Sequence, residues 1–153
     1  MESISFRSAE LQDLAILLEF EQGIVSTERP FDATLQGVTI YYYDIEAMIE
    51  ATDTEVMVGE VNGDVVASAY VTVKQAKPYF KHDRYAYVGF LYVKPEHRGK
   101  NFSQRMLDEL KSWSLARGLH EFRLDVYDAN VRAVSAYLKF GFEKQLVEMR
   151  MSI

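Results

Sequence analysis

The stretch from Val93 to Ser103 joins an apolar, strand-like run to an amphipathic helix through a short basic turn. The run before it, residues 85–93, is almost wholly apolar or aromatic, which is typical of a strand buried on both faces. Apolar residues then recur at helical spacing from Phe102 to Trp113. A buried strand that turns directly into a helix restricts the chain to folds in which helices pack on a sheet.

The turn itself has the chemistry of an anion site. The first N–H groups of a helix lack intrahelical partners, and they point, with the positive end of the helix dipole, at whatever lies before the helix. Arg98 and Lys100 are expected to add mobile positive charge there, although the net charge of the chain is -6. A solvated basic turn that only caps a helix is the competing interpretation.

The turn Arg98-Gly99-Lys100-Asn101-Phe102-Ser103 resembles the pyrophosphate-binding motif of the GNAT superfamily of N-acetyltransferases, Gln/Arg-x-x-Gly-x-Gly/Ala. Both small positions differ, with Asn101 for the first glycine and Ser103 for the second glycine or alanine. Asparagine tolerates a left-handed backbone, so we expect the turn to form with a narrower approach than glycine leaves. The resemblance implies that residues 98–103 bind acetyl-coenzyme A.

A second segment, Asn130 to Phe142, resembles the family pattern Asn-x-x-Ala-x-x-x-Tyr-x-x-x-Gly-Phe. Asn130 suits a helix N-cap, and Gly141 suits a left-handed stop before a last strand. The resemblance implies that Asn130 and Tyr137 contact the cofactor, and that Tyr137 gives a proton to the departing thiolate. Alternatively, a small helix packs on a sheet and Tyr137 is an ordinary half-buried aromatic. Two motifs in the family's order favour the functional interpretation.

The resemblance also implies a place for the pantetheine arm of the cofactor. In the family it lies between two parallel strands that splay apart, here around Leu91 and Leu124. Backbone groups of Leu91, Tyr92 and Val93 would then contact the cofactor. Gly89, within an otherwise bulky strand, suits a bulge or a close backbone approach.

The residue that takes a proton from the amine is not evident from the sequence. Some family members carry a glutamate eleven positions before the first residue of the pyrophosphate motif, and Tyr87 stands there in this chain. A neutral tyrosine is a poor base. Either a remote acid acts through water or the amine arrives deprotonated. The weak candidates are acids of the first half of the chain: Glu21, Glu28, Asp32 and Glu46.

Hydrophobic spacing predicts the remaining architecture. Strands are expected at residues 4–7, 54–61, 65–73, 85–93 and 122–127, and helices around residues 11–18, 45–49, 102–113 and 130–140. Asn62-Gly63 is a strong hairpin signal between two of the strands. We therefore predict an α/β (α+β) fold resembling that of the family: a mixed, mostly antiparallel twisted sheet, with helices on both faces and a splayed parallel strand pair.

Composition agrees with a single domain over residues 1–153. The chain is 48% hydrophobic and 26% charged, and a length of 153 residues suffices for one sizeable core. Without a long apolar run or a basic, apolar N-terminus, neither a membrane span nor a signal peptide is expected. With no cysteine the chain has no disulfide, thiolate metal site or cysteine nucleophile. We expect a cytoplasmic protein without a metal.

Charge is divided unevenly along the chain. Residues 1–64 contain fourteen acids and two bases, a formal charge of −12, whereas residues 65–153 contain fifteen bases and nine acids, a charge of +6. In the family the first half commonly walls the acceptor site, so the resemblance implies an acidic acceptor mouth beside a basic cofactor mouth. Such a mouth favours a small cationic amine or a basic peptide end. Surface acids that serve only solubility are the alternative.

Two functions from different classes follow. The first is an N-acetyltransferase that moves an acetyl group from acetyl-coenzyme A to a primary amine by direct attack. The second is a non-catalytic acyl-coenzyme A binding module, for which the missing glutamate and the altered glycines would be natural. The net negative charge argues against a nucleic-acid binder, because such proteins need a broad basic face. A homodimer is an expectation from family habit alone.

Overall fold

The computed structural model describes residues 3–153, which fold around one five-stranded sheet in the order β1-β2-β3-β4-β5. Four strands form an antiparallel meander: β1 (Ser5–Ser8), β2 (Thr54–Val61), β3 (Asp64–Gln75) and β4 (Arg84–Val93). β5 (Phe122–Arg123) pairs with β4 in parallel. The predicted fold class is confirmed.

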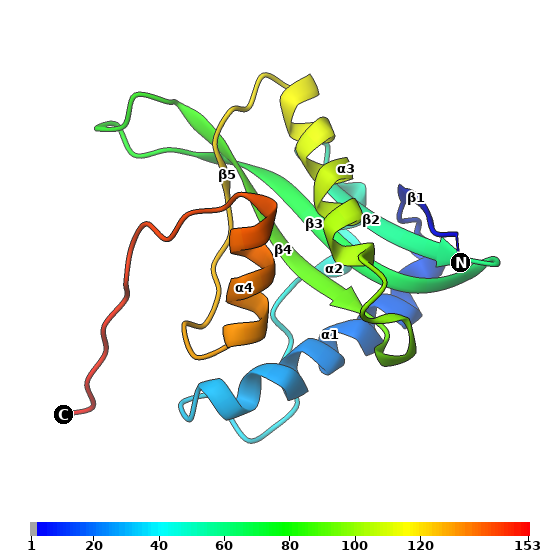
Figure 1. The fold of residues 1–153 in the computed structure, drawn as a ribbon, viewed down its shortest axis with the longest axis horizontal. Coiled ribbons are helices and arrows are strands. Elements are labelled where there is room, and N and C mark those ends of the chain that lie inside the picture. The colour runs from blue at the N-terminus through cyan, green and yellow to red at the C-terminus, as the bar shows by residue number, and fades with distance from the viewer. Residues whose placement is uncertain (1–2) are drawn as a thin grey trace.

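Four α-helices cover the two faces of the sheet (Figure 1). α1 (Leu14–Glu28) and α2 (Ile45–Glu50) lie on one face, and α3 (Phe102–Ala116) and α4 (Val131–Phe140) lie on the other. Single 3-10 turns flank them, namely η1 (Leu11–Asp13), η2 (Arg29–Phe31) and η3 (Pro95–His97). The hairpin at Asn62-Gly63 forms as predicted, with positive φ at both residues, as a two-residue hairpin loop requires.

A β-bulge in the middle of β4 divides the strand between the two cores. The register with β3 shifts between Ser68 and Tyr70, and Phe90 takes a positive φ of 57°. Val88 therefore packs into the core under α3, while Phe90 packs into the core under α1. In a regular strand these two residues would share a face.

The glycine beside the bulge leaves room for the Tyr70 ring. A side chain at Gly89 would place its Cβ 2.5 Å from the Tyr70 ring. The hydroxyl of Ser68 donates to the Phe90 carbonyl at 3.1 Å, which satisfies a backbone group at the irregular position. The bulge expected at Gly89 is thus confirmed, and the group that approaches this glycine closely is the Tyr70 ring.

Three elements differ from the sequence predictions. The first helix, expected around residues 11–18, continues to Glu28 as α1. β5 is two residues long rather than six, because β4 and β5 diverge after the pair Tyr87–Arg123. The prediction of a last strand after Gly141 is wrong for the described chain. Residues 142–153 have no regular structure. A strand needs an edge to pair with, and this segment has no strand partner among residues 3–153.

Candidate active site

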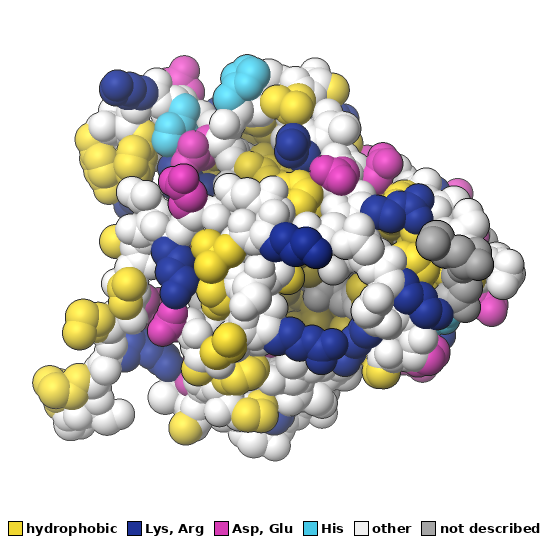
Figure 2. All heavy atoms as spheres, viewed as in Figure 1, with side chains coloured by type: hydrophobic (Ala, Val, Ile, Leu, Met, Phe, Trp, Pro, Cys, Tyr) yellow, Lys and Arg dark blue, Asp and Glu magenta, His cyan; other side chains and the backbone are white. Residues whose placement is uncertain are grey.

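The two sequence motifs meet on one face of the sheet. α3 follows the basic turn and α4 carries the second motif, and the Gln104 side-chain amide ties them together by donating to the Ala136 carbonyl at 3.0 Å. Figure 2 shows a hollow with an apolar floor between α4 and the start of α3, with Lys and Arg side chains at its rim. The structure therefore brings together residues that are about thirty positions apart.

The turn before α3 takes the backbone shape that an anion site needs. Asn101 adopts the left-handed conformation, with φ 66° and ψ 19°, and Gly99 has φ 77°. Within the described residues, the Asn101 side chain makes no capping hydrogen bond, and no atom lies within 4 Å of a Cβ placed on Gly99. The first N–H groups of α3 therefore have no side-chain cap from Asn101, and such groups suit an anion.

Side chains of this turn divide into core and surface. Phe102 is buried in the core under α3, so only its backbone can face a ligand. Gly99, Lys100 and Asn101 are exposed, and Ser103 is partly buried. We expected the Asn101 side chain to narrow the approach of a ligand to this turn. At Gly99 the approach is nevertheless open.

Arg98 differs from the mobile cation expected from the sequence. Its Nε donates to the Val93 carbonyl at 2.8 Å, and its guanidinium lies 5.5 Å from the centre of the Tyr92 ring. Arg98 therefore fastens the turn to the end of β4 while it brings positive charge there.

The parallel strands splay as predicted. Among the described residues, β4 and β5 pair only at Ala86–Phe122 and Tyr87–Arg123, and β4 then continues for six more residues. Leu91, Tyr92 and Val93 lie partly buried at the free end of β4. In the described chain, β5 does not pair with β4 at these three residues.

Tyr87, which stands where some relatives carry a basic glutamate, acts here as a donor. Its hydroxyl donates to the Asp125 carboxylate at 2.7 Å across the splay. Burial, and then this hydrogen bond, raise the pKa of Tyr87 well above its usual value. The structure therefore agrees with the expectation that this residue is a poor base.

α4 presents Tyr137 to the same region. Asn130 caps the helix by accepting from the Ala133 N–H at 3.3 Å, and Gly141 ends it with φ 126°, both as expected. Tyr137 packs against Phe142, with ring centres 5.9 Å apart. Burial, with the charge of Glu28, raises the pKa of Tyr137 to about 12. The hydroxyl is thus neutral at physiological pH and can donate.

Glu28 is one of the four acids that the sequence offered as weak candidates for the base. It is the last residue of α1 and is partly buried, and this burial raises its pKa above the ordinary 4.5. After burial, the charge of Glu28 also contributes to the raised pKa of the four tyrosines around it, Tyr42, Tyr43, Tyr127 and Tyr137. A desolvated carboxylate opposite a neutral tyrosine is a suitable acid–base arrangement.

The Tyr42 hydroxyl lies close to Glu28, and their interaction lowers the pKa of Glu28 against the larger effect of burial. In the described chain, however, this hydroxyl has no hydrogen bond of good geometry. Glu28 is therefore not fully committed to a partner, which leaves its carboxylate available for a proton.

Glu21 and Glu46 have other surroundings. Glu21 is fully buried, and its Oε2 accepts from the N–H groups of Tyr42 and Tyr43 at 2.7 and 2.9 Å. It therefore fixes the segment before α2 against α1. Glu46 is exposed on α2.

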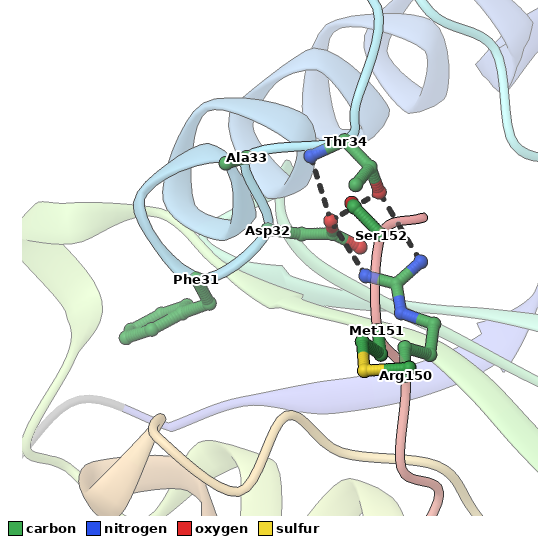
Figure 3. Close-up of a pocket in the computed structure, with 7 residues that line it drawn as sticks. All are labelled: Phe31, Asp32, Ala33, Thr34, Arg150, Met151 and Ser152. Carbon is green, nitrogen blue, oxygen red and sulfur yellow. Dashed lines mark hydrogen bonds and ion pairs between the residues drawn. The ribbon is translucent and has the colours of Figure 1, made fainter.

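Asp32, just after η2, lies in a second hollow of about 390 Å³ (Figure 3). Its carboxylate accepts from the Thr34 N–H at 2.9 Å, the Tyr127 hydroxyl at 2.8 Å and the Arg150 guanidinium at 2.9 Å. These hydrogen bonds, those of Thr34 foremost, hold the pKa of Asp32 well below its usual range. The hollow is lined by Phe31, Asp32, Ala33, Thr34, Arg150, Met151 and Ser152.

Comparison with known proteins decides the family. The model of the acetyltransferase (GNAT) family matches residues 22–142. The chain belongs to the GNAT family. This confirms the family and the enzyme class, an acetyltransferase, that the two motifs predicted.

Curated relatives of this GNAT chain match parts of it. An acetyltransferase of Yersinia pestis (strain Pestoides F) is 29% identical over 102 residues, 67% of either protein. The thialysine N-epsilon-acetyltransferase of Sus scrofa is 36% identical over 58 residues, which are 38% of this chain and 34% of the relative. The matched segment thus spans about a third of the porcine protein.

Solved structures share the GNAT fold over nearly the whole chain. A mutant of the BH1408 protein from Bacillus halodurans has a TM-score of 0.88 at 19% identity, covering 97% of this chain and 99% of its own. A predicted acetyltransferase with acetyl-CoA from Clostridium acetobutylicum has a TM-score of 0.73 at 21% identity, covering 98% and 96%.

The described residues offer two further observations. No helix among them is long and apolar enough to cross a bilayer. No group of three or more His, Cys, Asp or Glu side chains in residues 3–153 could hold a metal ion.

Proposed function

We propose that this protein transfers an acetyl group from acetyl-coenzyme A to a primary amine by direct attack. Three observations support this: the uncapped start of α3, the neutral Tyr137 on α4, which Gln104 ties to α3, and the desolvated Glu28, whose charge acts on Tyr137. Together they supply an anion site, an acid and a base.

The residues present fit the cofactor. The N–H groups that follow the left-handed Asn101 suit a pyrophosphate, and Arg98 and Lys100 add positive charge. The end of β4 that β5 does not pair, residues 91–93, suits the extended pantetheine arm, and we place Asn130, at the start of α4, on the other side of that arm. When bound, acetyl-coenzyme A supplies the activated acetyl thioester.

Glu28 accepts the proton of the attacking amine, directly or through one water. The amine nitrogen bonds to the carbonyl carbon, and the carbon–sulfur bond breaks. Tyr137 donates its hydroxyl proton to the departing sulfur and regains one through water. The step needs no covalent enzyme intermediate, because the amine nitrogen itself attacks the thioester carbon and the thiol leaves.

For the cofactor site, we expect Arg98→Ala to weaken acetyl-coenzyme A binding roughly 10- to 100-fold, as typical for a charge-assisted contact, without unfolding the protein. Asn101→Gly should leave binding unchanged or tighter, since glycine also adopts the left-handed turn. Titration calorimetry measures both. Absence of binding by the wild type would refute the cofactor assignment, and a marked loss in Asn101→Gly would mean that the asparagine side chain contacts the ligand.

The acceptor we propose is a small cationic amine or a basic peptide end. Asp32 supports this, because its buried carboxylate already holds a cation, the Arg150 guanidinium, beside Tyr127 and Glu28. The porcine relative is named for the N-epsilon amine of thialysine. An acceptor with a second positive charge would take the place of the guanidinium.

Charge dependence tests the acceptor. Asp32→Asn should raise KM for a cationic amine about 10-fold or more and spare cofactor affinity, since it removes one buried countercharge. Asp108→Asn, which changes an exposed acid on α3, is the matched control and should have no effect. The wild-type kcat/KM should also fall as salt shortens the Debye length from ~10 Å at 0.1 M to ~3 Å at 1 M. A best substrate that is neutral beyond its reacting amine, with rates indifferent to Asp32 and to salt, would overturn this acceptor class.

A broad amine panel with detection of free thiol tests the function as a whole. Acceptor-dependent release of coenzyme A is the expected result. Acetyl-coenzyme A binding without release, across diamines, amino sugars and lysine-ended peptides, would instead support the non-catalytic acyl-coenzyme A binding module.

A further inference from the structure

A hydrogen bond between side chains joins β4 to the stretch after β5 at the point where the two strands part (Figure 1). Tyr87–Arg123 is the last backbone pair of these strands in the described chain, and Asp125 stands two residues further along. The Tyr87 hydroxyl donates to the Oδ2 atom of Asp125 at 2.7 Å. This bond therefore continues the attachment of the strands one step beyond their backbone ladder.

The Tyr87 ring is held in place by β3. The Lys74 ammonium lies 3.9 Å from the centre of this ring, and the centre of the Tyr70 ring lies 6.4 Å from it. These contacts restrict the rotamers of Tyr87. Burial, and then the bond to Asp125, raise the pKa of Tyr87, so its hydroxyl stays protonated and donates at physiological pH. The bond is thus a fixed feature of the site.

The bond lies on the α1 side of the sheet. Tyr87 packs against the core under α1, whereas Leu124, which precedes Asp125, packs against the core under α3. Successive residues of an extended chain point to opposite sides, so Asp125 faces the same side as Tyr87. In the proposed reaction Glu28, the last residue of α1, acts from that side as well.

The proposed position of the cofactor sets the direction in which its acyl group points. The pyrophosphate is placed at the start of α3, beyond the end of β4, and the pantetheine arm along residues 91–93. The arm therefore runs from Val93 back toward Tyr87, over six residues that span at most about 20 Å of strand. Because the acyl group is the terminal group of an acyl-coenzyme A, it comes nearest to the last backbone pair.

We propose that the Tyr87–Asp125 bond closes the narrow end of the splay and limits the acyl group that this protein accepts to acetyl. This role depends on the proposed function, because that function places the acyl group beside the bond. Tyr87 and Asp125 are then residues that determine donor specificity, and neither takes a proton in the reaction.

Two physical effects oppose a longer acyl chain. The first is width, because the bond ties the two strands together and additional methylene groups find no room unless it breaks. The second is polarity, because these groups would lie against the Asp125 carboxylate, which would lose water without gaining a hydrogen bond. A site that is too short by one methylene group discriminates about 10- to 200-fold.

Titration calorimetry with acetyl-, propionyl- and butyryl-coenzyme A tests this role without an amine acceptor. The wild type should bind acetyl-coenzyme A about 10- to 200-fold more tightly than butyryl-coenzyme A. Tyr87→Phe keeps the ring and removes the hydroxyl, and Asp125→Ala removes the carboxylate. Each should lower that ratio of affinities about 10-fold or more. The double variant should resemble either single variant, because all three lack the same bond.

Tyr85→Phe is the matched control, since it removes a hydroxyl from the same strand two residues further from the splay. It should keep the wild-type ratio. Equal affinities of the wild type for the three donors, or a wild-type ratio in either single variant, would overturn the proposal and leave the cofactor assignment intact. Absence of binding of all three donors would refute both. A ratio of affinities does not depend on the amount of folded protein, so partial unfolding of a variant cannot produce the expected result.

Discussion

Replacing Tyr137 by phenylalanine is expected to lower kcat by about 10²–10⁴-fold, the range that general acid catalysis usually contributes. The ring and its packing against Phe142 remain, so acetyl-coenzyme A affinity and thermal stability should change little. Steady-state kinetics with the best amine of the panel, beside calorimetry with the cofactor, separates these quantities.

The pH profile of the wild type gives a second test of the role of Tyr137. Because the pKa of Tyr137 is raised to about 12, its hydroxyl stays protonated through pH 10, and the wild-type rate should not decline below that pH through loss of this proton. Tyr85→Phe, at a tyrosine on the far end of β4, is the control. Unchanged turnover in Tyr137→Phe would assign Tyr137 a purely structural role.

Replacing Glu28 by glutamine is expected to lower kcat/KM by about 10²–10⁴-fold as well, through loss of the base. In the wild type, kcat/KM should rise with pH as Glu28 loses its proton, at a pH above the ordinary value of 4.5. In the variant this rise should vanish, leaving only the titration of the acceptor amine. Glu19→Gln, at another glutamate of α1, is the matched control.

Stability distinguishes loss of the base from misfolding. The pKa of Glu28 is raised in the folded state, so its contribution to the free energy of unfolding is fully present at low pH and is lost as pH rises through that pKa. Glutamine does not titrate, so Glu28→Gln should gain stability relative to wild type between pH 4 and pH 8. Urea unfolding at both pH values measures this. A variant that is destabilised at pH 8, or one that keeps full activity, would contradict the assignment.

Local motifs were predictable from the sequence because their physics is local. The left-handed Asn101, the Asn130 cap and the Gly141 stop each depend on a residue and its immediate neighbours. The splay near Leu91 followed from the family resemblance, and the bulge beside Gly89 from one glycine in a bulky strand.

Long-range juxtapositions were not predictable in the same way. Glu28 was one of several acids in an ambiguous region, and its burial depends on α1 continuing to that residue. Arg98 looked mobile until the end of β4 offered it the Val93 carbonyl. The expected last strand failed for a similar reason, since a pattern can indicate a strand but cannot show which edge will receive it.

The bulge at Phe90 has a mechanical consequence for the two halves of the site. Because β4 contributes Val88 to the core under α3 and Phe90 to the core under α1, one strand supports both the helix that begins at the anion site and the helix that ends at Glu28. Neither helix can shift along the sheet without displacing the strand that seats the other. In the proposed reaction, the spacing between the start of α3 and Glu28 is therefore set by the backbone of a single strand rather than by the loops around it.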